Sequence, residues 1–189
     1  MVQINYKAIS WCAVFLSVAI FVVFLFPWDF NSISISDIWR ALGKTASIVS
    51  IIFILFSRYL WYRWPFKLLV PIPFLNGQWD GTVTYEWEGQ KHIKAISMSI
   101  RHTLFYIHLK VKTDESTSLS YSASFNINEQ RQERELIYSY SNEPSIQNRS
   151  KSPIHYGAAK LSISDDNQEL VGYYWTDRKT LGGLNFKKR

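Results

Sequence analysis

Residues 118–127 read SLSYSASFNI, and this stretch decides what kind of fold the second half of the chain can adopt. A polar residue alternates with an apolar or aromatic one at every second position, which is the period of a β-strand with one buried face. Because a slip of one residue would bury the serines, the register of this strand is well specified. The predicted inward face holds Leu119, Tyr121, Ala123, Phe125 and Ile127.

The same alternation extends in both directions, from residue 77 to the end of the chain. Turn signals such as 87–89, 113–115, 142–144 and 165–167 separate the alternating runs. The inward sets on either side of residues 118–127 are Trp79, Gly81, Val83 and Tyr85; Ile96, Met98 and Ile100; Phe105, Ile107, Leu109 and Val111; Leu136, Tyr138 and Tyr140; Gly157, Ala159, Leu161 and Ile163; Leu170, Gly172, Tyr174 and Thr176; and Leu184 and Phe186.

About eight short strands in this order predict an antiparallel meander that closes into an eight-stranded β-barrel, lipocalin-like but smaller. A barrel of this size is either filled by its own side chains or just wide enough for one small ligand. The predicted inner faces carry tyrosine, threonine and glycine besides aliphatic residues, and buried hydroxyls need partners. We therefore expect a cup with a polar-lined mouth, and we expect Trp79 to plug its base.

The first third of the chain has a different composition. Residues 8–26 contain no charged side chain, and as a helix these 19 residues would be about 28 Å long, close to the hydrocarbon thickness of a bilayer. Pro27 and Trp28 follow, as expected at the interface where a membrane helix ends. The alternative, a cleavable signal peptide, would have a shorter apolar run and a small-residue cleavage site before Pro27. We expect a retained span.

A second apolar run extends from Ala41 to Tyr62. Its uncharged centre, residues 45–57, is too short to span a membrane alone, but the long side chains of Lys44 and Arg58 at its edges can reach the headgroups. The alternative is a buried or interfacial helix. Asp37 is expected to cap this helix. The short linker between the two runs predicts a membrane α-helical hairpin.

Charge is distributed unevenly between the two halves. Residues 1–70 carry six basic and two acidic groups, whereas residues 71–189 carry 15 basic and 13 acidic groups. The basic residues that flank the two apolar runs predict that both termini, and therefore the barrel, lie in the cytoplasm. The small excess on the barrel disfavours binding to a polynucleotide. We expect a two-helix region over 1–66, a proline-rich linker over 67–74 and a ligand-binding barrel over 75–189.

Motifs for catalysis are absent from the sequence. It contains no GxSxG, P-loop or HExxH pattern. The single cysteine, Cys12, lies in an apolar run and can form neither a disulfide nor a zinc site within the chain. Four histidines are spread over three predicted strands, so no metal site and no cofactor are expected. The protein is predicted not to be an enzyme.

Features for ligand binding are better represented. Tyr138 and Tyr140 place two rings on one strand, and residues 173–175 are all aromatic. An aromatic ring that faces a cup can stack on a nucleobase; the alternative is plain barrel core. Arg178, at a strand end between Thr176 and Thr180, can hold a phosphate through two hydrogen bonds; the alternative is a solvated arginine in a turn.

Two motifs accompany this order of parts. Residues 75–82 read LNGQWDGT, and residues 170–174, LVGYY, lead through Arg178 to GGLNF at 182–186. Together with the two predicted spans, they resemble the two-transmembrane β-barrel effectors of bacterial cyclic-oligonucleotide-based anti-phage signalling systems (CBASS). The resemblance covers essentially the whole chain. Lipocalin-like barrels also begin with Gly-x-Trp-x-Gly, so the resemblance depends on the combination.

The resemblance implies a mechanism. A partner nucleotidyltransferase makes a cyclic dinucleotide, the barrel binds it, the protein oligomerises in the inner membrane, and the spans disrupt that lipid bilayer, which kills the infected cell. The ligand-binding residues expected on this basis are Tyr121, Tyr138, Tyr140 and Tyr174 for base stacking, and Thr176, Arg178 and Thr180 for phosphate. Two alternatives remain: a membrane-anchored lipocalin-like carrier or sensor of an apolar ligand, and a structural module of a membrane complex.

Overall fold

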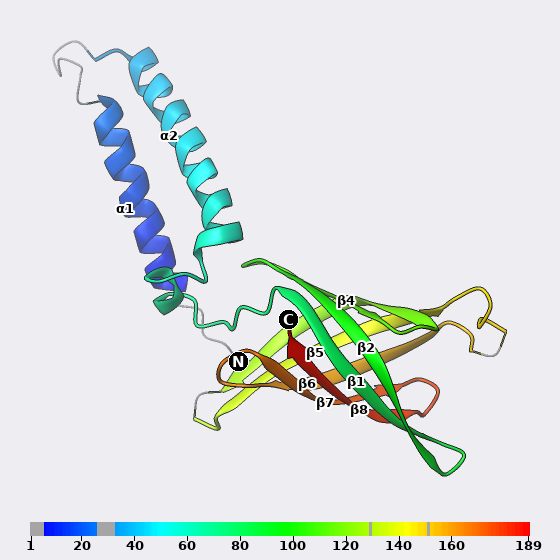
Figure 1. The fold of residues 1–189 in the computed structure, drawn as a ribbon. Coiled ribbons are helices and arrows are strands. Elements are labelled where there is room, and N and C mark those ends of the chain that lie inside the picture. The colour runs from blue at the N-terminus through cyan, green and yellow to red at the C-terminus, as the bar shows by residue number, and fades with distance from the viewer. Residues whose placement is uncertain (1–5, 26–32, 129, 151) are drawn as a thin grey trace. The chain divides into compact units, whose positions relative to one another are not determined.

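A computed structural model describes residues 6–25, 33–128, 130–150 and 152–189 of the chain (Figure 1). The chain divides into two compact units, with the boundary between Pro71 and Ile72. This boundary falls inside the stretch predicted as a linker. The two units are described in turn.

The first unit contains two long helices that pack against each other, α1 (Tyr6–Leu25) and α2 (Ile35–Leu55). A π-helical turn, Phe56–Leu60, continues α2, and a 3-10 turn follows at Phe66–Leu68. Among the described residues, the continuous helix Ile35–Leu60 is long and apolar enough to cross a membrane. The apolar part of α1, Ile9–Leu25, is shorter. The expected interfacial residues Pro27 and Trp28 lie outside the described residues.

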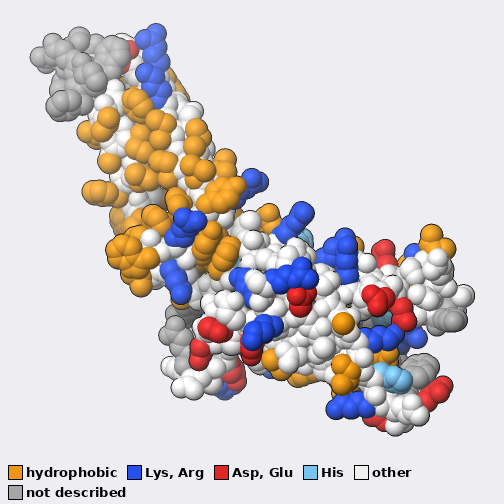
Figure 2. Space-filling model, viewed as in Figure 1, with side chains coloured by type: hydrophobic (Ala, Val, Ile, Leu, Met, Phe, Trp, Pro, Cys, Tyr) orange, Lys and Arg blue, Asp and Glu red, His pale blue; other side chains and the backbone are white. Residues whose placement is uncertain are grey.

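Three serine hydroxyls on these helices bond within their own helix. The hydroxyls of Ser17, Ser47 and Ser50 donate to the carbonyl oxygen four residues earlier, over 2.8–2.9 Å. Such bonds satisfy polar groups that lipid cannot satisfy. Figure 2 shows hydrophobic side chains over most of the visible surface of the helices. These features are typical of helices that face lipid.

The start of α2 differs from the prediction that Asp37 caps it. The N-cap is Ser34, whose side chain accepts from the backbone N–H of Asp37, while the Asp37 carboxylate accepts from the backbone N–H of Ser34 over 3.1 Å. This reciprocal pair is a capping box, in which the acidic residue is the third helical residue rather than the cap. The helix therefore begins at Ile35, a full turn and a half before the apolar run that predicted it.

The second unit is a closed barrel in which every strand is antiparallel to both neighbours, so the predicted eight-stranded meander is confirmed. Strand β8 pairs with β1 and closes the sheet. The strands are β1 (Gly77–Trp87), β2 (Gln90–His102), β3 (Ile107–Lys112), β4 (Ser116–Asn128), β5 (Glu133–Pro144), β6 (His155–Ile163), β7 (Glu169–Thr176) and β8 (Leu181–Lys188). Phe105, expected in the third strand, lies instead in the turn before β3.

Large side chains fill one half of the barrel interior. This is the half where the chain enters at Gly77 and where β8 ends. The Trp79 side chain is fully buried there, and its indole N–H donates to the carbonyl oxygen of Leu75 over 3.1 Å. The other fully buried core side chains of the barrel are Leu75, Met98, Ile100, Leu136, Leu161, Leu170 and Phe186. The entry end is therefore closed, and only the opposite end can admit a ligand.

A β-bulge in β4 overturns the predicted orientation of Tyr121. The pairing with β5 shifts between Ser120, opposite Tyr140, and Ser122, opposite Ser139, so Tyr121 is the extra residue. A bulge reverses which side of the strand faces inward. After it, Ala123 and Phe125 pack on the core as predicted, whereas Tyr121 is 63% exposed. Before it, the serines of β4 face the interior.

Candidate functional site

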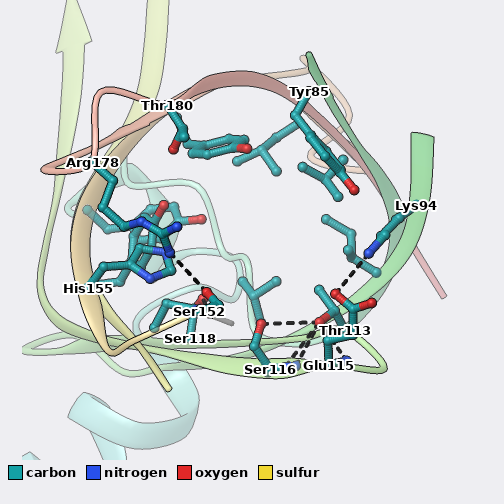
Figure 3. Close-up of a pocket in the computed structure, with 18 of the residues that line it drawn as sticks. Tyr85, Lys94, Thr113, Glu115, Ser116, Ser118, Ser152, His155, Arg178 and Thr180 are labelled. Atoms are coloured by element: carbon teal, nitrogen blue, oxygen red, sulfur yellow. Dashed lines mark hydrogen bonds and ion pairs between the residues drawn. The ribbon is translucent and has the colours of Figure 1, made fainter. Parts of the chain in front are cut away.

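A cavity of about 280 Å³ occupies the half of the barrel that the core leaves open. It opens at the end opposite the chain entry, among the β1–β2, β3–β4 and β7–β8 turns (Figure 3). Its walls combine aliphatic residues in the depth with polar and charged residues at the mouth. The lining residues are Val83, Tyr85, Glu86, Lys94, Ile96, Val111, Thr113, Glu115, Ser116, Ser118, Tyr138, Tyr140, Asn142, Ser152, His155, Tyr174, Arg178, Thr180 and Leu184.

Three tyrosines, Tyr138, Tyr140 and Tyr174, form the aromatic part of the wall. The first two rings lie 5.8 Å apart, and Tyr138 is 4% exposed. Burial raises the pKa of all three hydroxyls, so each is protonated and can donate a hydrogen bond. Within the described part of the chain, these hydroxyls have no hydrogen-bond partner. None of the three oxygens is among the fully buried atoms without a partner; they line the open cavity, where each can donate to a polar ligand.

Two glycines make room for these rings. A Cβ added to Gly157 would lie 2.6 Å from the ring and hydroxyl of Tyr140, its cross-strand partner on β5. Gly182 has the same relation to Tyr174 on the neighbouring strand. The Tyr140 and Tyr174 rings therefore pack directly over the backbone of these glycines. Any larger residue at either position would push the ring into the cavity and narrow it.

Replacing Gly157 with alanine is expected to displace the Tyr140 ring into the cavity. Overpacking of this kind lowers the free energy of unfolding by about 1–3 kcal/mol, and the narrowed cavity should also bind ligand more weakly. Urea unfolding of the full chain measures the first effect. The matched control is Gly89→Ala, because an added Cβ there meets no atom within 4 Å although the backbone φ of 73° is strained. An equal fall in ligand affinity in both variants would contradict the prediction that Gly157→Ala narrows the cavity.

Two cationic side chains lie on opposite sides of the mouth (Figure 3). Lys94 of β2 forms an ion pair with Glu115, with Nζ 2.8 Å from Oε2, and this hydrogen bond raises the pKa of Lys94. Arg178 donates from Nη1 to the hydroxyl of Ser152 over 2.9 Å. Arg178 has no carboxylate partner among the described residues. The mouth can therefore attract an anion from two sides.

The β7–β8 turn positions Arg178. The hydroxyls of Thr176 and Thr180 lie 2.6 Å apart, and the backbone N–H of Thr180 donates to the Thr176 hydroxyl over 3.3 Å. The backbone N–H of Lys179 donates to the Thr176 carbonyl, with Lys179 at φ 61°. These bonds fix a tight turn with Arg178 at its tip.

The structure brings together five of the seven residues predicted to bind ligand. Tyr138, Tyr140, Tyr174, Arg178 and Thr180 line the cavity; their role in binding stays a prediction. The expectation that Tyr121 faces the cup is wrong, because of the bulge in β4. Thr176 is not part of the cavity lining, and its hydroxyl bonds to that of Thr180 within the turn; its role in binding also stays a prediction.

Sequence reasoning missed several polar residues of the wall. Lys94 lies on the same inward face of β2 as Ile96 and Met98. A lysine in the sequence pattern of an apolar face could have indicated that this side chain faces the cavity. Asn142 continues the alternation of the two tyrosines on β5. Ser118 could not be found in this way, because it faces inward only as a result of the bulge.

No metal site accompanies the cavity. Among residues 6–25, 33–128, 130–150 and 152–189, no three His, Cys, Asp or Glu side chains are grouped so that they could hold a metal ion. From the described residues, aliphatic and aromatic side chains face the depth of the cavity, and polar and charged side chains face its mouth. Its chemistry is that of a binding site for a polar, anionic, aromatic molecule.

Comparison with known proteins agrees with this geometry. Residues 70–188, the whole barrel, match the family described as "Cap15, cyclic dinucleotide receptor domain". The chain belongs to this Cap15 family. It is also 28% identical over 182 residues to CD-NTase-associated protein 15 from Staphylococcus schleiferi, covering 96% of this chain and 94% of that protein. The resemblance to CBASS effectors is thereby confirmed, and the cavity is the candidate cyclic dinucleotide site of a Cap15 domain.

Proposed function

We propose that this protein is a non-enzymatic CBASS effector of the bacterial inner membrane, which binds a cyclic dinucleotide in its barrel, oligomerises and then disrupts the membrane. One observation carries the proposal: phenol hydroxyls without protein partners line a cavity whose mouth has cations on two sides. A nucleotidyltransferase that makes the ligand is the expected functional partner, in agreement with the name of the S. schleiferi relative, CD-NTase-associated protein 15.

The aromatic wall fits a nucleobase. Base stacking on an aromatic side chain contributes about 1–3 kcal/mol per base. The cavity of about 280 Å³ lies at the lower limit of roughly 300–1,000 Å³ for small-molecule sites. It therefore holds one base in its depth, while the second base of a cyclic dinucleotide lies at the mouth. There Tyr85 and His92, whose rings stack 5.4 Å apart, extend the aromatic surface of the barrel.

The two phosphates of a cyclic dinucleotide lie on opposite sides of its ring, as Arg178 and Lys94 do at the mouth. Arg178 can offer two parallel N–H groups to one phosphate. Lys94 can contact the other only if that phosphate displaces or shares its bond to Glu115. Glu115 therefore lowers the affinity for weak anions and favours a ligand that engages both cations together.

The alternative, a carrier of an apolar ligand, is less well supported. A cavity for such a ligand would leave the three tyrosine hydroxyls unsatisfied, which costs about 1–3 kcal/mol for each group. The charged mouth would contribute nothing to binding. A cyclic dinucleotide offers polar groups to the tyrosine hydroxyls and phosphates to the cations at the mouth.

The membrane part of the proposal rests on the helices. The helix Ile35–Leu60 meets the length and composition of a span, and α1 packs against it as the second member of a hairpin. Exposed apolar side chains on both helices, such as Phe15 and Ile51, are suited to lipid or to other copies of the hairpin. Basic flanks support cytoplasmic termini and a cytoplasmic barrel.

The ligand proposal is tested by thermal unfolding of the full chain in lipid nanodiscs with a panel of cyclic dinucleotides. Ligand at a hundredfold excess over its Kd stabilises the barrel by about 2.7 kcal/mol, so the Tm should rise by several degrees with at least one member. No shift with any member would overturn the proposal, and a shift with fatty acids alone would favour the carrier.

The membrane-disruption proposal makes a separate prediction. Ile51→Asp places a carboxylate in the middle of the apolar helix, which costs about 3 kcal/mol at the bilayer centre. We expect this variant to abolish the growth arrest that follows expression of the protein with its nucleotidyltransferase, while the thermal shift with ligand is retained. Ile51→Leu is the matched control and should remain toxic. Growth arrest by both variants would mean that the helices are only anchors.

A further inference from the structure

One outer face of the barrel combines cations with exposed aromatic side chains. The outward residues of β3 are His108, Lys110 and Lys112, and Arg101 of β2 lies opposite His108. All four side chains are exposed. Among the described residues, Arg101, Lys110 and Lys112 form no ion pair. The barrel residues that do form one are Lys94, Arg134, Lys160, Lys187 and Arg189. We call these four residues the basic strip.

The β2–β3 turn next to the basic strip carries two aromatic side chains. Phe105 is 67% exposed and Tyr106 is 49% exposed. The turn is rigid, because the Thr103 N–H donates to the Tyr106 carbonyl over 2.9 Å and the Thr103 hydroxyl accepts from two backbone N–H groups of the turn. The ring of Tyr106 lies 5.3 Å from that of His108, so the turn and the strip are continuous.

This turn lies at the end of the barrel where the chain arrives from the helices. The backbone N–H of His102, the last residue of β2, donates to Asn76, and its ring accepts from the N–H of Leu75. Leu75 follows directly on the proline-containing segment that connects the two units. That segment is the covalent connection between the barrel and the helices.

The opposite side of the same end carries acidic residues. The β6–β7 turn, four strands away around the barrel, carries Asp165 and Asp166. Only one of them forms an ion pair, Asp165 with Arg134 at 3.3 Å. An anionic surface close to this end of the barrel would attract the β2–β3 side and repel the β6–β7 side.

We propose that the basic strip and the β2–β3 turn dock on the anionic lipid surface of the membrane that holds the chain's own helices. Lysine and arginine bind anionic headgroups, and aromatic rings prefer the interface between headgroups and acyl chains. Because the chain itself holds the barrel at the membrane, a few such contacts are enough for docking. The cavity mouth lies at the other end of the barrel and stays accessible to ligand. The inference rests on the membrane anchoring in the proposed function.

The experiment uses the full chain with Cys12→Ala, reconstituted in vesicles. A single cysteine at Phe105→Cys carries a fluorophore, and spin-labelled lipids report its contact with the membrane. The matched control is Asp165→Cys, an exposed position at the same end on the acidic side. We expect lipid quenching at position 105 in vesicles that contain phosphatidylglycerol, much less quenching in phosphatidylcholine alone, and none at position 165. Equal quenching at both positions, or none at position 105, would overturn docking.

A charge variant separates docking from anchoring. Reversing Arg101, Lys110 and Lys112 to glutamate should remove the quenching at position 105, because each lost cation lowers binding to an anionic surface about fivefold. The variant should still float with the vesicles, since its helices are unchanged. Quenching that survives the reversal would overturn the role of the strip. A parent chain that fails to float would refute the anchoring instead.

Discussion

Replacing Arg178 with alanine is expected to weaken the binding of a cyclic dinucleotide about 10- to 100-fold. Hydrogen bonds to a charged group contribute about 1.5–3 kcal/mol, and tenfold in affinity corresponds to about 1.4 kcal/mol. In the structure the guanidinium faces the cavity at the tip of the β7–β8 turn and bonds to the Ser152 hydroxyl rather than to a carboxylate. The charge is thus available to a phosphate.

The matched control is Lys179→Ala, one residue further along the same turn. Lys179 does not line the cavity, and it already has a positive φ, so alanine adds no strain relative to lysine. Isothermal titration of the full chain should show a large loss for Arg178→Ala and little change for Lys179→Ala. The Tm without ligand should be the same for both. An equal loss of affinity in the two variants would mean that only general charge attraction matters.

The barrel could be predicted from the sequence because its strands keep strict two-residue alternation. In β5, Leu136, Tyr138 and Tyr140 all face inward, and a shift of one position would have buried Ser139. The closing of the sheet followed from the number of strands and the short turns. Such patterns are local, and tertiary packing reinforces them.

The site was less predictable because it depends on one inserted residue. The bulge at Tyr121 has no signature in SLSYSASFNI, where serine and alanine fit either face of a strand. It moved a predicted ligand residue outward and placed Ser118 in the wall. Thr176 is not part of the cavity lining, and its hydroxyl bonds within its own turn, as a hydroxyl near a strand end can do as readily as bind a ligand. Lys94, in contrast, was visible as a lysine on an apolar face.

The closed end of the barrel contains a buried histidine that should make its stability depend on pH. His102 is 6% exposed, and its ring lies 5.9 Å from Phe74 and 5.2 Å from Phe125. The N–H of Leu75 donates to its Nδ1 over 3.3 Å. Burial, followed by the positive charge of Lys188, lowers the pKa of His102 from 6.5 to about 4.

The sign follows from proton binding. Between pH 4 and 6.5 the unfolded chain protonates His102 while the folded barrel keeps the ring neutral, so the unfolded state binds more protons. Stability is therefore full above about pH 6.5 and is lost as the pH falls toward 4. The shift corresponds to about 3 kcal/mol, of which about 2–3 kcal/mol should be lost between pH 7 and pH 4.5.

Urea unfolding of the full chain at these two pH values measures this loss. His102→Asn keeps an acceptor near Nδ1 but cannot take up a proton. It should unfold more easily at pH 7, because the ring contacts are gone, yet lose far less stability on acidification. His108→Asn, which removes an exposed histidine, should retain the pH dependence of the parent chain. If His102→Asn retained it too, the acid sensitivity would belong to the carboxylates, such as Glu135, whose pKa is lowered mainly by its hydrogen bond to Lys160.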